Sequence, residues 1–248
     1  MGLRMAVPAV AVVVAASLVV AAEPGPAAAG EWSARPELLT EYPLHAGAGI
    51  VVGGPYRLFA ASSLGWMPSP YLDGTNQLLV ALFEDSGYPQ DTADLVESSL
   101  ESALVCRFRG GWQPFRGAGF YFAVGYTLAA LGGGVTGVAV LEAVTGKEVP
   151  EGSGDSQRGF DVSSALHMVD FELGWMWLVG EHWTVRAALG GAFTVGSSTW
   201  VEARFQPAGK KARDGVAALE QEGEDYLNDT YTTYVHTPVV TAAVGYRF

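Results

Sequence analysis

Most apolar stretches of this chain alternate with a period of two residues, and this pattern constrains the fold more than any other feature. From Trp183 to Phe205 the odd positions carry mostly large apolar side chains, whereas the even positions carry mostly small, polar or charged ones. Successive side chains of a β-strand point to opposite faces of the sheet, so the pattern predicts a strand with one apolar and one polar face. The same alternation, weaker in the last two ranges, is found in Ser164–Leu178, Gly117–Leu131, Ala103–Gln113, Tyr56–Met67 and Leu44–Gly53. We therefore expect an all-β fold.

The polar faces indicate on which side of the sheet the apolar residues lie. These faces carry charges of both signs and many of the chain's 32 glycines. A soluble β-sandwich buries its apolar faces, whereas a membrane barrel turns them outward and keeps a narrow, crowded, polar interior. Apart from the N-terminus, no apolar run approaches the roughly 20 residues of a membrane-spanning helix. We expect a transmembrane antiparallel up-and-down β-barrel over residues 44–248, with a soluble secreted β-barrel as the alternative.

The charged side chains of the polar faces are expected to form a network inside this barrel. Buried charges are tolerated when they are paired, so arginines and acids on lumen faces predict one another. The predicted lumen network consists of Arg57, Arg107, Arg109, Arg186, Arg204, Arg247, Asp170, Glu172 and Glu202.

Large aromatic residues gather near the ends of the predicted strands. In membrane barrels such residues form girdles at the two bilayer interfaces. The predicted girdle residues are Trp66, Trp112, Trp175, Trp177, Trp183 and Tyr246.

The number of strands is not settled by the pattern. Seven strands alternate clearly, and a barrel whose two ends lie on one side of the membrane needs an even number. The missing strand is expected in residues 31–42 or in residues 77–83, which makes eight strands, with ten as the alternative. Short helices are expected in two long loops, one after the cap sequence of residues 91–94 and one at residues 212–227.

The N-terminus has the three parts of a secretory signal peptide. Arg4 supplies the positive charge, residues 6–20 form a 15-residue apolar core, and small residues follow. We expect cleavage after Ala22, with Ala29 as the alternative. Residues 1–22 are then the signal peptide and residues 23–43 an N-terminal leader.

Charge and composition exclude several function classes. The formal charge of −12 is opposite to that of a nucleic-acid-binding surface. With a single cysteine, Cys106, the chain cannot form an intramolecular disulfide or a thiolate metal cluster. The acidic run between Asp214 and Asp229 lacks the regular ligand spacing of a calcium loop. We expect neither a metal nor a cofactor.

The last predicted strand carries the most specific motif. Large and small apolar residues occupy alternate positions from Pro238 onward, and the final positions are Val244, Tyr246 and Phe248. This ending resembles the C-terminal assembly signal of bacterial outer-membrane proteins. More broadly, residues 44–248 are similar in pattern to small OmpA-type and porin-like barrels, although we recognise no characterised subfamily. The resemblance implies Sec-type export, insertion by the barrel-assembly machinery, and a location in the bacterial outer membrane, in contact with lipid and lipopolysaccharide.

Three functions follow from a barrel of this size. In the first, the paired charges close the lumen and the protein has a structural or surface-interaction role. The alternative is a small pore or transporter for small or apolar solutes. The third, a lipid-directed enzyme, is disfavoured because Ser164 and Asp170 lie on the opposite strand face from His167. We therefore expect a largely closed barrel without catalytic activity.

Overall fold

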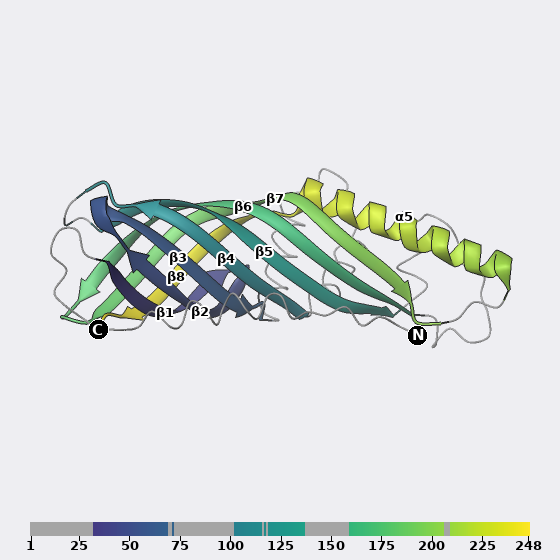
Figure 1. Cartoon of the computed structure of the whole chain (residues 1–248), viewed down its shortest axis with the longest axis horizontal. Coiled ribbons are helices and arrows are strands. Elements are labelled where there is room, and N and C mark those ends of the chain that lie inside the picture. Colours follow the sequence, from purple (N-terminus) through teal and green to yellow (C-terminus); the bar gives the residue numbers. More distant parts are fainter. Residues whose placement is uncertain are drawn as a thin grey trace.

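The computed structural model describes residues 32–68, 71, 102–115, 117, 119–136, 159–205 and 209–248. These residues form one closed antiparallel barrel in which neighbouring strands follow one another along the chain and β1 closes against β8 (Figure 1). The eight strands are β1 Ser33–Tyr42, β2 His45–Gly53, β3 Leu58–Trp66, β4 Ser102–Trp112, β5 Phe120–Thr136, β6 Gly159–Val179, β7 Trp183–Ala203 and β8 His236–Tyr246. The predicted up-and-down barrel of eight strands is confirmed.

Strand β1 is the eighth strand, whose position the sequence pattern did not decide. It pairs with β2 along Ser33–Glu41 and with β8 along Glu37–Tyr42. It thus comes from the first of the two expected stretches, while residues 77–83 lie outside the described part of the chain. The sheet therefore begins at Ser33, within the residues assigned to a leader, and not at residue 44. The pattern is hard to read here because the inward face carries mainly charges (Arg35, Glu37 and Glu41).

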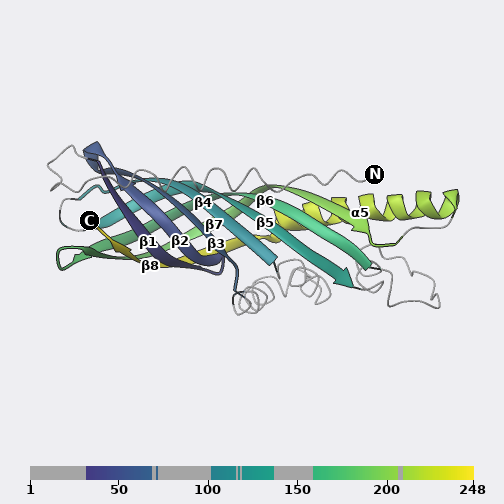
Figure 2. The same cartoon turned by 60° about the horizontal axis from the view of Figure 1, so that its bottom comes forward.

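The strands differ strongly in length, so the rim of the barrel is slanted. Strands β2 and β3 have 9 residues each, whereas β6 and β7 have 21 residues each. Strands β5, β6 and β7 therefore run far past the ends of β1–β3 on one side of the molecule (Figures 1 and 2). We call residues 129–136, 159–166 and 197–203, which pair with one another past the start of β8, the extension.

A long helix, α5 Lys210–Tyr234, lies along the extension and leads into β8. It contains the stretch 212–227 that was predicted to be helical, and this prediction is confirmed. The other predicted loop helix, after residues 91–94, lies outside the described residues. No helix in the described ranges is long and apolar enough to cross a bilayer.

A bulge in β7 reverses the faces of its upper part. His167 pairs with Gly196 and Met168 with Thr194, so Val195 is an extra residue without an opposite partner. A shift of one residue moves every following side chain to the other face. As a result Val201 is buried at 7% exposure and Trp200 is exposed at 60%, the reverse of what uninterrupted alternation predicts.

Below the bulge the faces are as predicted, with apolar side chains outside and charges inside. Phe171, Leu173 and Val124 are exposed, whereas Asp170 and Glu172, their neighbours on β6, are buried. This is the inverse of a soluble protein, in which the largest apolar side chains are enclosed.

The predicted girdle residues all lie on the outer face. Trp112, Trp175, Trp177, Trp183 and Tyr246 lie at the end of the barrel where β4, β6 and β8 end and β7 begins. Among these, the rings of Trp183 and Tyr246 contact each other, with centroids 5.2 Å apart. Trp66 lies at the opposite end, where β3 ends.

A buried network of ion pairs across the lumen

Two arginines of β4 reach across the lumen to carboxylates of β1 and β6. Arg107 Nη1 lies 2.7 Å from Glu41 Oε2, and its Nη2 donates to Asp170 Oδ1 at 2.8 Å. Arg109 Nη1 lies 2.7 Å from Glu41 Oε1 and 2.6 Å from Glu172 Oε2. Glu41 therefore bridges the two arginines, and Glu172 continues the network beyond Arg109.

A third arginine, Arg186 of β7, carries the network back to β1. Its Nη1 donates to Glu172 Oε1 at 2.9 Å and its Nη2 to Glu37 Oε2 at 2.9 Å. Arg35 Nε donates to the other oxygen of Glu37 at 3.3 Å. The result is one alternating series, which we call the ion-pair chain: Asp170, Arg107, Glu41, Arg109, Glu172, Arg186, Glu37 and Arg35. Its four arginines and four carboxylates balance in formal charge.

Hydroxyl groups satisfy further oxygens of the ion-pair chain. Thr127 Oγ1 donates to Asp170 Oδ2 at 2.7 Å, and Thr241 Oγ1 donates to Glu172 Oε2 at 3.0 Å. The Tyr121 hydroxyl donates to the other oxygen of Glu172. Buried carboxylates of this kind need several donors each, because the lumen offers them little water.

The ion-pair chain is enclosed on all sides. Its side chains are exposed by 3% or less, except for Arg35 at 16%. Space for it is made by Gly125 of β5, where an added Cβ atom would lie 2.6 Å from Arg109 Cγ and 3.0 Å from Asp170 Oδ1. The polar layer therefore requires a glycine on the neighbouring strand, directly opposite Arg109 in the ladder.

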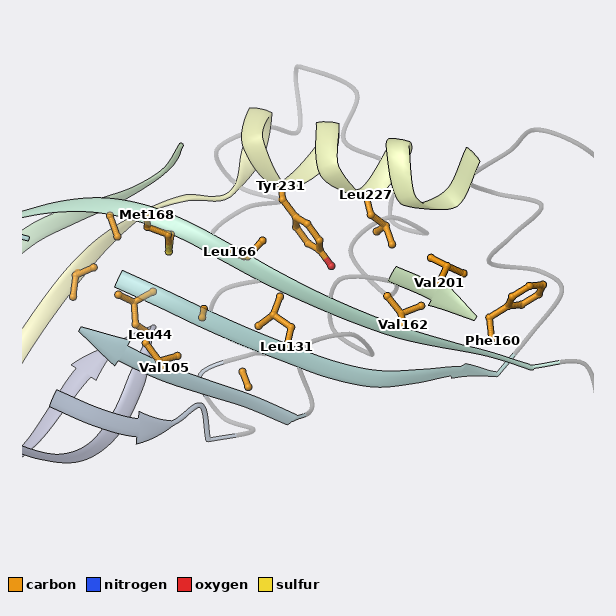
Figure 3. Close-up of a cluster of buried hydrophobic side chains, with 14 residues drawn as sticks. Leu44, Val105, Leu131, Phe160, Val162, Leu166, Met168, Val201, Leu227 and Tyr231 are labelled. Atoms are coloured by element: carbon orange, nitrogen blue, oxygen red, sulfur yellow. The ribbon is translucent and has the colours of Figure 1, made fainter. Parts of the chain in front are cut away.

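Apolar side chains pack inside the barrel on both sides of this polar layer. Toward the aromatic end, Tyr121, Ala123, Met176 and Ala188 form a small cluster with Phe59. Toward the extension, a larger cluster is formed by residues of β4–β8 together with Leu44 of the turn between β1 and β2 and Leu227 and Tyr231 of α5 (Figure 3). The charges thus lie between two apolar layers, where their mutual attraction is weakly screened.

Five of the nine residues predicted for the lumen network belong to the ion-pair chain. They are Arg107, Arg109, Arg186, Asp170 and Glu172. Arg247 faces inward by strand parity, but within the described residues no ion pair joins it to the chain.

The predictions for Arg57, Glu202 and Arg204 were wrong. Arg57 is exposed in the turn between β2 and β3, where its Nη1 donates to the Pro114 carbonyl at 2.6 Å. Glu202 and Arg204 lie beyond the bulge in β7 and are therefore on the outside. Arg204 Nε donates to Asp161 Oδ1 at 2.7 Å, which raises the pKa of the guanidinium group.

Arg35, Glu37 and Glu41 of β1 were missed because this strand was assigned to the leader. One signal for them was present in the sequence. The predicted network held six arginines and only three acids, an imbalance that a buried site cannot sustain. Further carboxylates were therefore needed, and they had to come from a strand not yet counted.

The positions of Ser164 and His167 agree with strand parity. Ser164 Oγ lies inside, 3.0 Å from Thr199 Oγ1. His167 lies outside, where its Nδ1 shares a hydrogen bond with the Tyr126 hydroxyl. His45 is buried with its Nδ1 3.4 Å from Glu41 Oε2, and His182 stacks on Tyr246. Ser164 and His167 are thus separated by the wall of the barrel.

Comparison with known proteins gives only distant likenesses. No family model matches the chain, and no curated protein matches it by sequence. Among solved structures, the crystal structure of Acinetobacter baumannii CarO aligns over 87% of this chain and 97% of its own, with 10% identity and a TM-score of 0.37. A. baumannii CarO2 aligns over 88% and 98%, with 11% identity and a TM-score of 0.35. Likenesses at these values say nothing about what the barrel does.

Proposed function

We propose that this protein is an outer-membrane β-barrel whose lumen is closed by the ion-pair chain, and that its role is structural or surface-interacting. The proposal includes export through the Sec pathway, insertion by the barrel-assembly machinery through the ending Val244, Tyr246 and Phe248, and contact with lipid and lipopolysaccharide. The outer surface of the barrel supports the membrane location, and the contents of the lumen support its closure.

The outer face of β6 supports a membrane location because its apolar part has the height of a bilayer core. Outward residues are apolar or aromatic from Trp177 up to Val169, and polar residues begin at His167 and continue with Ser163 and Asp161. Trp177 and His167 are ten residues apart, which in a strand tilted by about 40° corresponds to a height of about 25 Å. This matches the apolar band of outer-membrane barrels. The extension then lies outside the bilayer.

The observation that carries the closed-lumen proposal is the continuity of the ion-pair chain. It joins β1, β4, β6 and β7, and Thr127 of β5 and Thr241 of β8 are hydrogen-bonded to it. An eight-stranded barrel has an interior that side chains can fill completely. Here the filling groups are buried ions, and separating one of them from its partners leaves a buried charge uncompensated. Spontaneous opening of a water-filled path is therefore costly.

Conductance across planar lipid bilayers tests this proposal. We expect the wild-type protein to insert without producing stable current steps. The double variant Glu41→Ala, Arg109→Ala removes two adjacent groups from the middle of the ion-pair chain, and we expect it to produce small steps. A matched control, Asp161→Ala, Arg204→Ala, removes an exposed ion pair and should remain silent.

Two results would contradict the proposal. Stable steps from the wild type would favour the alternative function, a small pore for small or apolar solutes. A silent Glu41→Ala, Arg109→Ala variant that is folded by circular dichroism would show that the apolar layers close the lumen without the ion-pair chain.

Location is tested separately, by fractionation of inner and outer membranes of cells that express the full chain.

A further inference from the structure

Helix α5 lies along an edge of β7 that no strand covers in the described structure. Strand β8 pairs with β7 only from Trp183 to Phe193, but β7 continues to Ala203. An unpaired strand edge exposes backbone donors and acceptors, which proteins usually cover. In Figure 1, α5 runs beside this upper part of β7.

Side chains of α5 accept the hydrogen bonds that a neighbouring strand would accept at this edge of β7. Glu220 Oε1 accepts a hydrogen bond from Ala203 N at 2.9 Å, and Glu224 Oε1 accepts one from Val201 N at 3.0 Å. Four helical residues advance by about 6 Å and two strand residues by nearly 7 Å, so residues four apart on α5 keep pace with alternate residues of β7. The carboxylates thus cap successive backbone donors of the edge.

A third contact lies nearer to the barrel. Ser197 Oγ donates to Asn228 Oδ1 at 2.9 Å, between side chains four residues further along α5 and four residues back along β7. Leu227 and Tyr231 add an apolar contact, because both are buried in the cluster that includes Val162 and Val201 of the extension (Figure 3).

The helix itself is poorly stabilised by its own sequence. Its N-cap is Gly209 with φ of 89° and provides no side-chain cap, and Gly215 and Gly223 lie in its interior. Lys210, Lys211 and Arg213 place positive charge at the N-terminus, where the helix dipole disfavours it. The last turn contains no basic residue. The helical state of α5 therefore depends on its contacts with β7.

We propose that α5 is a releasable strap, helical while its carboxylates cap the upper edge of β7 and able to detach while the barrel stays closed. Closure of the barrel does not depend on α5, because the pairing of β8 with β7 and β1 and the ion-pair chain all lie outside it. Detachment uncovers the upper edge of β7 and the apolar inner wall of the extension. The strap thus lies on the extension, which projects past the ends of the short strands β1–β3.

Amide hydrogen exchange of the full-length protein, refolded in lipid nanodiscs, tests the proposal. We expect the amides of α5 and those of Val201 and Ala203 to exchange together through local opening, while amides in residues 183–193 of β7 stay protected. Glu224→Ala removes one charge-assisted hydrogen bond and should speed exchange of this group about tenfold or more. The matched control Asp225→Ala removes an exposed carboxylate of the same helix and should not speed it.

Two outcomes would overturn the strap. In the first, α5 is as strongly protected as residues 183–193. In the second, Glu224→Ala raises exchange in α5 and in the lower barrel together, which means that the helix is an integral part of the barrel. Glu224→Gln retains an acceptor oxygen and keeps the comparison informative if the alanine variant assembles poorly.

Discussion

Replacing Arg107 by methionine tests the ion-pair chain at an arginine that contacts two buried carboxylates. Methionine keeps much of the length of the side chain but none of its donors, so Glu41 and Asp170 both lose their contact with Arg107. Removing one partner of a buried ion pair typically costs about 3–5 kcal/mol, and we expect the free energy of unfolding to fall by this amount.

The variant Asp170→Asn should cost less, and the difference follows from the geometry. An asparagine oxygen can still accept from Arg107 Nη2, and Arg107 keeps its second carboxylate, Glu41. The hydrogen bond to Arg107 is weakened, and the Thr127 hydroxyl loses its acceptor because the amide nitrogen takes the place of Oδ2, but Arg107 itself keeps a partner on both sides. We expect a loss of about 1–3 kcal/mol.

Equilibrium unfolding in urea, with the protein inserted in phosphatidylcholine vesicles and followed by tryptophan fluorescence, measures both changes. Arg204→Met is the control, because its ion pair with Asp161 is exposed and should make no measurable difference. The reasoning is refuted if Arg107→Met is no more destabilising than Arg204→Met. It is also refuted if Asp170→Asn costs more than Arg107→Met.

Three further predictions test other parts of the structure. Gly125→Ala should destabilise the barrel by about 1–3 kcal/mol in the same urea assay, because its Cβ atom meets the ion-pair chain, whereas Gly110→Ala, which meets nothing within 4 Å, should be neutral. Val201→Asn should increase proteolysis of the extension and Trp200→Asn should not, whereas uninterrupted alternation in β7 predicts the opposite order. Phe248→Ala should lower the amount of barrel recovered from outer membranes without changing the urea midpoint of the protein that is recovered, and an unchanged yield would contradict its role as an assembly signal.

Strand parity was sufficient to predict the barrel and much of its interior. A period of two is a local property of the chain, so it placed Arg107, Arg109, Arg186, Asp170 and Glu172 inside without any knowledge of their partners. It failed for Glu202 and Arg204, because the inserted residue Val195 exchanges the inner and outer faces of β7 beyond it.

Strand β1 shows a second limit of the sequence pattern. Its inward positions include Arg35, Glu37 and Glu41, and these residues resemble a polar leader until their partners on β4 and β7 are known. Their pairing is a long-range property of the closed barrel. The excess of arginines over acids among the predicted lumen residues was a signal that did not depend on local pattern. It indicated that further acids had to come from a strand that the alternation had not identified.

The pairing between β1 and β8 has a consequence for the order in which the barrel is completed. These strands pair only from Glu37 to Tyr42, whereas β6 and β7 pair along almost their whole length. Glu37 binds Arg186 of β7, on the far side of β8, whereas Glu41 binds Arg107 and Arg109 of β4 across the lumen. First and last strands join late because their contact closes the longest loop in the chain. Glu37 of β1 can therefore bind Arg186 of β7 only when the cylinder shuts, and this buried ion pair then adds a side-chain link from the first strand past the last one, beside a short backbone pairing.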